Sequence, residues 1–110
     1  DVTGVQTCAL PICIVLLKGA ATIVAEPKGR IYINTSGNSG MAKGGSGDVL
    51  TGMIASLLAQ GYPPYEAAVL GCFTHGRAGD EAAKKLGETG MIAGDIIDAI
   101  PNVFKHLYSL

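Results

Sequence analysis

The residues best suited to chemistry lie between Asn38 and Gly52, in the run NSGMAKGGSGDVLTG. Closely spaced glycines let a backbone turn tightly and approach a ligand. Past Gly47, apolar residues recur three and four positions apart, which predicts a helix over residues 47–60. The free N–H groups and the dipole of a helix N-terminus favour an anion such as a phosphate. Asp48 would then be a carboxylate base beside a phosphate site, and this pairing indicates phosphoryl transfer.

Spacing excludes two common phosphate-binding loops. A P-loop requires lysine directly after its last glycine, but Gly45 is followed by Ser46, and Lys43 precedes the double glycine. A dinucleotide fingerprint requires a third glycine where this chain has Leu50. The remaining alternative is a glycine-rich connector before an ordinary helix, with Asp48 as its capping residue.

The full string Asn-x-Gly-Met-Ala-x-Gly-Gly-x-Gly-Asp-Val-Leu-x-Gly resembles the signature of the ADP/ATP-dependent NAD(P)H-hydrate dehydratases, a family of the ribokinase-like superfamily. Residues 17–22 resemble the family's Leu-Lys-Gly-Ala-x-Thr segment, and residues 93–101 resemble its last helix. The resemblance is nearly continuous from about residue 14 to the end. It implies an α/β fold, the C-terminal part of the ribokinase-like fold, with short strands and a β-hairpin followed by four helices.

The resemblance also implies roles for individual residues. Asp48 would be the catalytic base and would contact the substrate hydroxyl. Asn38 would either contact substrate or position the loop, whereas Lys43 is expected to be solvated. No metal ligand is predicted. The expected nucleotide-binding residues are Lys18, Gly19, Ala20, Ala21, Thr22, Gly45, Ser46 and Gly47.

The activity implied is ADP-dependent dehydration of (6S)-NAD(P)H hydrate to NAD(P)H, with release of AMP and phosphate. ADP is the expected co-substrate, ATP is the alternative, and Mg²⁺ is the expected cofactor. A homo-oligomer and an NAD(P)H-hydrate epimerase, fused or separate, are the expected partners. One alternative is a ribokinase-like kinase that phosphorylates a vitamin or sugar. Another is a truncated fragment without activity.

Composition sets broader limits. The chain has 110 residues, 48% of them hydrophobic, which is enough for one small domain with a core. The net charge of −1 and the lack of a basic cluster argue against nucleic-acid binding, and no apolar run is long enough to span a membrane. Three cysteines without ligand-like spacing to histidine form no disulfide framework, so a cytoplasmic location is expected. Cys72 and His75 are expected to be buried packing residues.

The pattern along the chain predicts the elements that hold the loop. A continuous apolar run at residues 14–18 predicts a buried strand of a parallel sheet. Residues 21–34 predict a hairpin, and helices are expected at 47–60, 64–86, 94–100 and from Pro101 onward. Residues 1–13 resemble translated sequencing-adapter DNA and are expected to be non-native, so the dehydratase domain is assigned to residues 14–110.

Overall fold

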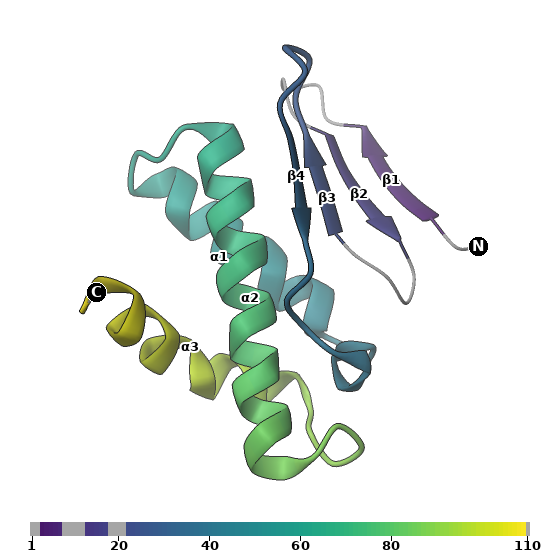
Figure 1. Ribbon diagram of the computed structural model, residues 1–110, viewed down its shortest axis with the longest axis vertical. Coiled ribbons are helices and arrows are strands. Elements are labelled where there is room, and N and C mark those ends of the chain that lie inside the picture. Colours follow the sequence, from purple (N-terminus) through teal and green to yellow (C-terminus); the bar gives the residue numbers. More distant parts are fainter. Residues whose placement is uncertain (1–2, 8–12, 18–21, 110) are drawn as a thin grey trace.

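The strands come first along the chain and the helices follow. In space, the sheet lies beside the group of helices (Figure 1). The computed structural model describes residues 3–7, 13–17 and 22–109. The elements are β1 (Thr3–Thr7), β2 (Cys13–Leu17), β3 (Thr22–Ala25), β4 (Ile31–Asn34), the short 3₁₀ turn η1 (Ser39–Met41), α1 (Ser46–Ala59), α2 (Pro64–Leu86) and α3 (Ala93–Tyr108). The non-native origin of residues 1–13, which include β1, stays a prediction.

The four strands form one sheet in the order β1-β2-β3-β4, with every neighbouring pair antiparallel. The prediction of a parallel strand at residues 14–18 is therefore wrong for the described sheet. Only four residues separate β2 from β3, whereas a parallel connection needs a dozen or more. The short connection leaves antiparallel pairing as the only arrangement open to these neighbours.

The predicted hairpin is confirmed. Thr22 pairs with Asn34 and Val24 with Tyr32 across β3 and β4. The turn is closed by the N–H of Gly29, which donates to the carbonyl of Glu26 at 2.9 Å. Gly29 has a φ of 100°, a left-handed conformation that glycine adopts at little cost.

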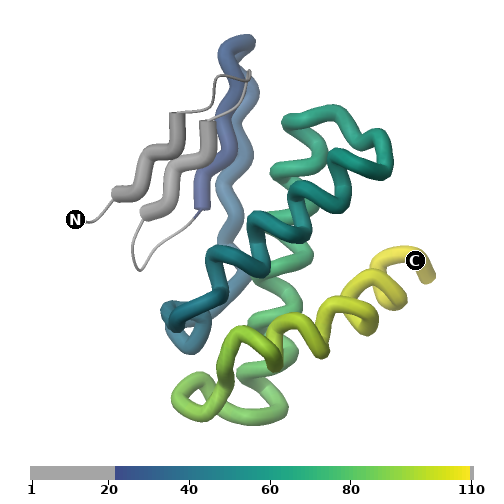
Figure 2. Tube along the Cα trace, turned by 180° about the vertical axis from the view of Figure 1, so that it is seen from behind, coloured from purple at the N-terminus to yellow at the C-terminus, as the bar shows by residue number. Residues whose placement is uncertain are grey.

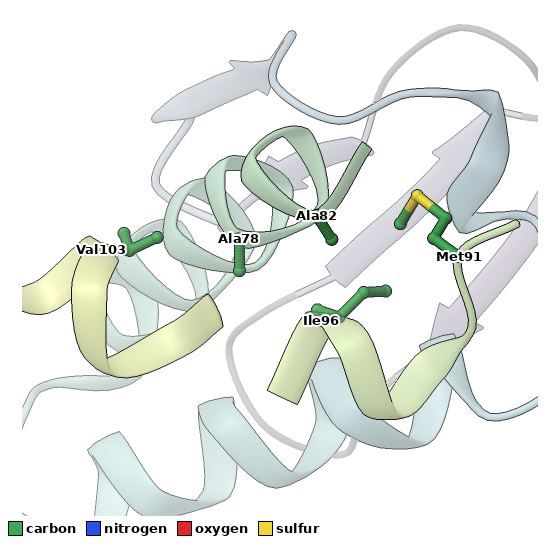
Figure 3. Close-up of a cluster of buried hydrophobic side chains, with 5 residues drawn as sticks. All are labelled: Ala78, Ala82, Met91, Ile96 and Val103. Carbon is green, nitrogen blue, oxygen red and sulfur yellow. The ribbon is translucent and has the colours of Figure 1, made fainter. Parts of the chain in front are cut away.

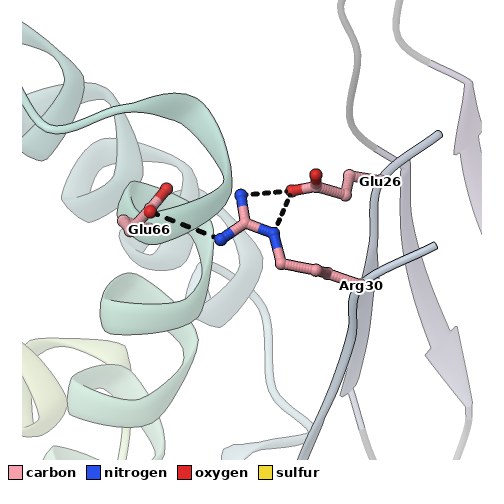
Figure 4. A network of polar contacts seen from close by, with 3 residues as sticks. All are labelled: Glu26, Arg30 and Glu66. Carbon is pink, nitrogen blue, oxygen red and sulfur yellow. Dashed lines mark hydrogen bonds and ion pairs between the residues drawn. The ribbon is translucent and has the colours of Figure 1, made fainter. Parts of the chain in front are cut away.

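Arg30 fastens the hairpin to the start of α2 (Figure 4). Its Nη2 lies 2.6 Å from an oxygen of Glu26, and its Nη1 lies 3.5 Å from an oxygen of Glu66. The guanidinium also stacks over the ring of Tyr65, 4.2 Å from the centroid. Because the arginine side chain is 56% exposed, water screens these ion pairs, and they set the geometry more than they stabilise the fold.

Helix α2 covers one face of the hairpin. Val24 is fully buried, and Asn34 is buried with its Nδ2 donating to the carbonyl of Cys72 at 3.0 Å. On the opposite face Ile31 and Ile33 are 64% and 58% exposed. This alternation follows from the period of two in a strand.

The helix boundaries of α1 and α2 agree with the sequence pattern to within one residue, but the last two predicted helices are one. Pro101 lies inside α3, where it removes one backbone hydrogen bond. Its side chain is exposed, and the buried residues Ile96 and Val103 lie on either side of it along the helix. Packing of this apolar face against α2 offsets the lost bond, so the helix continues. None of the helices among residues 22–109 combines the length and apolar character that a membrane crossing requires.

Small residues let the helices approach closely (Figure 3). One core cluster joins α2, α3 and the connection between them, and consists of Ala78, Ala82, Met91, Ile96 and Val103. The glycines of α2 serve the same purpose. A Cβ at Gly71 would lie 2.6 Å from Cγ1 of Ile54, and a Cβ at Gly76 would lie 2.8 Å from the backbone carbonyl carbon of Ser36. These small residues mark the close packing of α2 against α1 and against the loop.

We expect Gly76→Ala to destabilise the protein by about 1–3 kcal/mol, because the backbone at Ser36 must shift to admit the methyl group. Gly52→Ala is the matched control, since a Cβ there meets nothing within 4 Å; in a helix it should stabilise by about 0.5–1 kcal/mol. Denaturant unfolding of both variants measures the difference. Equal midpoints would contradict the close packing of α2 against the loop.

Candidate active site

The glycine loop, residues 35–45, runs from the end of β4 to the start of α1. Gly45 is the N-cap of α1, with a φ of 92°, and a Cβ there would lie 3.1 Å from the Cβ of Ala93. The helix begins at Ser46, one residue earlier than predicted. The prediction that the loop ends at a helix N-terminus is confirmed.

Asp48 is the third residue of α1 and is exposed. The N-cap is Gly45, so Asp48 is not the capping residue that the alternative interpretation required. Among the described residues, no hydrogen bond or ion pair involves its carboxylate. The side chain is therefore a carboxylate that none of the described residues engages.

The first turn of α1 presents backbone donors near this carboxylate. No side chain of the described residues caps the helix. Within the described part of the chain, the N–H groups of Gly45 and Gly47 have no acceptor, whereas the N–H of Ser46 donates to the carbonyl of Lys43 at 3.2 Å. Free donors at a helix N-terminus suit an anion. Gly45 and Gly47 are thus better placed than Ser46 to bind phosphate, and the nucleotide contacts of all three stay predictions.

Of the other predicted nucleotide-binding segment, only Thr22 lies among the described residues. Lys18, Gly19, Ala20 and Ala21 are outside the described residues. Thr22 is the first residue of β3 and pairs with Asn34, the last residue of β4 before the glycine loop. Thr22 therefore lies at the end of the hairpin from which the glycine loop departs.

Asn38 holds the loop in shape. Its Oδ1 accepts the N–H of Gly40 at 3.0 Å, which caps η1. Its Nδ2 donates to the carbonyl of Gly79 at 3.0 Å and to Oδ1 of Asp80 at 2.9 Å. Both amide hydrogens are used within the protein. These contacts establish the loop-positioning role, while contact with substrate stays a prediction.

Asp80 is bonded to the loop, a contact that the sequence pattern did not predict. Besides its contact with Asn38, its Oδ2 accepts the N–H of Gly37 at 3.0 Å. The two partners are separated by 43 positions, and no spacing rule connects a carboxylate in α2 with a glycine in the loop. An acidic side chain on the small-residue face of a helix was the one local signal.

The expectation of a solvated Lys43 is wrong. Its Nζ donates to the carbonyls of Thr89 at 2.6 Å and Met91 at 2.7 Å, with that of Glu88 at 3.3 Å. An ammonium group has three donors and no acceptor, so a turn that presents three carbonyls on one side satisfies it. Figure 2 shows the loop and the α2–α3 connection at the same end of the molecule.

His75 joins α2 to the first residue of α1. Its Nε2 lies 3.0 Å from the carbonyl oxygen of Ser46, which can only accept, so the ring proton is assigned to Nε2. Burial lowers the pKa of His75, although the bond to Ser46 opposes this effect. Cys72 is also buried, which raises the pKa of its thiol to about 11. Both are packing residues, as expected.

The described residues do not form a metal centre. No group of three or more histidine, cysteine, aspartate or glutamate side chains among them has the arrangement of a metal site. Any Mg²⁺ that accompanies a nucleotide is held largely by phosphate oxygens and water, which requires few protein ligands.

Comparison with known proteins assigns the family. A protein-family model described as NAD(P)H-hydrate dehydratase matches residues 6–102. The chain belongs to the NAD(P)H-hydrate dehydratase family. Two curated members of the family are the bifunctional NAD(P)H-hydrate repair enzyme Nnr of Moorella thermoacetica, 55% identical over 94 residues, and the ADP-dependent (S)-NAD(P)H-hydrate dehydratase of Neisseria meningitidis, 52% identical over 86 residues. These matches cover 86% and 77% of this chain.

A solved structure of the NAD(P)H-hydrate dehydratase family shares the fold. The ADP/ATP-dependent NAD(P)H-hydrate dehydratase of Bacillus subtilis, co-crystallised with ATP/Mg²⁺, superposes with a TM-score of 0.77 at 33% identity over 84% of this chain. The α/β C-terminal fold class is confirmed by this match. The chain spans 18% of the Moorella relative, 29% of the Neisseria relative and 34% of the Bacillus structure.

We expect Lys43→Met to destabilise the protein by about 1.5 kcal/mol, because the hydrogen bonds of the ammonium group are lost. This is the low end of the range for hydrogen bonds to charged groups, since the partners here are partly solvated. Lys105→Met removes the same charge from an exposed position of α3 and serves as control. Thermal unfolding reports both. Equal melting temperatures for the two variants would mean that the three contacts of Lys43 contribute nothing to stability.

Stability should also depend on His75. Its folded-state pKa is lowered, so the native state binds fewer protons than the unfolded state, in which the pKa is about 6.5. The contribution of His75 is complete above pH 6.5 and is lost as the pH falls toward the folded pKa. Unfolding measured from pH 8 to 5 should show this decline, and His75→Gln should reduce it. As a control, His106→Gln changes an exposed histidine and should leave the decline in stability unchanged. A full decline in His75→Gln would show that another group causes it.

Proposed function

We propose that this chain carries the phosphoryl-transfer part of an enzyme that converts (6S)-NAD(P)H hydrate back to NAD(P)H with ADP. One observation carries the proposal: the exposed carboxylate of Asp48 has no partner among the described residues. It stands on a helix turn where the N–H groups of Gly45 and Gly47 have no acceptor among those residues. The family match and the curated relatives named as NAD(P)H-hydrate dehydratases support the choice of substrate.

The proposed reaction has two steps. Asp48 takes the proton of the hydrate hydroxyl while that oxygen attacks the terminal phosphorus of ADP, and the bond from this phosphorus to the AMP oxygen breaks. The N–H groups of Gly45 and Gly47 hold the charge on the transferring group. The phosphate then leaves with the C–O electron pair, a proton departs from the neighbouring carbon, and the ring double bond returns. AMP and phosphate are the by-products.

Nucleotide binding is proposed for the loop and for the segment Lys18–Thr22, whose last residue pairs with Asn34, the residue just before the loop. We favour ADP because the Neisseria relative is named as ADP-dependent, although the Bacillus protein is named as ADP/ATP-dependent. Mg²⁺ would neutralise phosphate charge. Asp48 is an exposed carboxylate beside the proposed phosphate site, and the described residues offer no larger ligand set.

The proposal extends to the setting of the reaction. The chain spans less than two fifths of these relatives, so we propose that the active site includes residues outside it and that the 110 residues alone are inactive. The bifunctional repair enzyme of Moorella supports fusion to, or cooperation with, an NAD(P)H-hydrate epimerase. A homo-oligomer in the cytoplasm completes the proposal.

The second candidate is a ribokinase-like kinase that phosphorylates a vitamin or sugar hydroxyl. It would use the same loop and base, because the first chemical step is the same. The products separate the two: a dehydratase restores the absorbance of reduced nicotinamide, while a kinase releases a stable phosphate ester. The assay uses a chimera in which the 94 matched residues of this chain replace those of the Moorella relative.

In this chimera, Asp48→Asn should lower kcat by about 10²–10⁴-fold, the usual contribution of a general base, and leave ADP binding largely intact. Asp98→Asn makes the same change at an exposed position of α3 and should be silent. Cofactor absorbance gives turnover, and calorimetry gives ADP affinity. Normal turnover by the Asp48 variant would refute the assignment of the base.

A further inference from the structure

Asp80 takes no part in the proposed reaction, yet it is hydrogen-bonded to the glycine loop, which is proposed to bind the phosphoryl group. Its Oδ2 accepts the N–H of Gly37 at 3.0 Å, and its Oδ1 accepts from Nδ2 of Asn38 at 2.9 Å. Hydrogen bonds to an ionised carboxylate are stronger than bonds between neutral groups. The side chain is half-buried on α2, so a rigid helix fixes two consecutive residues of the loop.

The contacts continue from Asp80 into the loop. Asn38, which also donates to the carbonyl of Gly79, accepts the N–H of Gly40 through Oδ1. Gly40 is buried against the α2–α3 connection, where a Cβ would lie 2.6 Å from the carbonyl oxygen of Glu88. The bonded chain from Asp80 through Asn38 thus ends at Gly40, five residues before the N-cap of α1.

We infer that Asp80 is a positioning residue, which aims the N–H groups of the glycine loop and the carboxylate of Asp48 at the transferring phosphoryl group. The inference rests on the proposed function. Fixed donors stabilise a transition state because they need no reorganisation during the reaction. Without the hydrogen bonds to Asp80, the loop would no longer hold its N–H groups in this alignment.

Asp80→Asn tests the inference with a side chain of the same shape. Both groups that face the carboxylate are donors, so whichever way the new amide turns, its NH₂ meets one of them. In the chimera, kcat should fall by about 10–100-fold, the usual effect of misplaced catalytic groups. The KM for ADP should change less, because residues 18–22 are proposed to hold the nucleotide as well.

Val103→Ala is the control for a merely structural effect. Val103 is buried in the core between α2 and α3 and is not part of the loop contacts. Its truncation should lower the melting temperature through a cavity and leave kcat unchanged below that temperature. If Asp80→Asn lowers kcat no more than Val103→Ala does, the inference is overturned.

Amide hydrogen exchange provides a second measurement on the 110-residue chain. Peptides covering residues 36–47 should exchange faster in Asp80→Asn and at the original rate in Val103→Ala, compared at equal distance below each melting temperature. Unchanged exchange in Asp80→Asn overturns the inference. A chimera that releases a stable phosphate ester and does not restore reduced nicotinamide would instead refute the proposed function, and the exchange result would still decide whether Asp80 holds the loop.

Discussion

The candidate site depends on one close contact, which lies between α2 and the glycine loop. Gly76 and Gly79 lack a Cβ where Ser36 and Met41 lie against the helix, so the loop rests directly on the helix backbone. Only at this separation can the carbonyl of Gly79 and the carboxylate of Asp80 reach the loop. The direction in which α1 leaves the loop, and with it the position of Asp48, depends on this contact.

The loop is held by two charged side chains of opposite sign, each matched to the polar groups that it meets. The carboxylate of Asp80 accepts hydrogen bonds from a backbone N–H and from the amide NH₂ of Asn38. The ammonium group of Lys43 donates hydrogen bonds to three backbone carbonyls. These residues are half-buried and bonded within the protein. Asp48 is exposed, and its carboxylate has no partner among the described residues. The contrast separates the groups that build the site from the one that is available to a substrate.

The helices and the hairpin support one side of this site. Helix α2 covers one face of β3 and β4, while Ile31 and Ile33 on the other face are largely exposed. These relatives are about three to six times as long as the matched segment, as their coverage of 18–34% shows. The proposed enzyme therefore places the loop and its base in this chain and the remaining contacts to substrate outside it.

Local pattern was sufficient for the elements whose causes are local. The hairpin follows from its turn residues, α1 and α2 follow from apolar periodicity ended by Gly61 and Gly87, and the run around Asp48 identifies the family. The continuity of α3 across Pro101 was not predictable in this way, because packing against α2 outweighs the local cost of proline.

By itself, the sequence determined the glycine loop, the helix that follows it and the carboxylate at its start, since these depend on neighbouring residues. Only the tertiary structure decided that Asp80 and Lys43 hold the loop, because their partners lie 42 to 48 positions away along the chain. It also decided that Asp48 is the third residue of α1 and not its cap. For Asp80 and Lys43, the physical reason is that hydrogen bonds between distant segments depend on how the helices pack, which residue spacing does not encode. For Asp48, the reason is the left-handed backbone of Gly45, which makes that residue the N-cap.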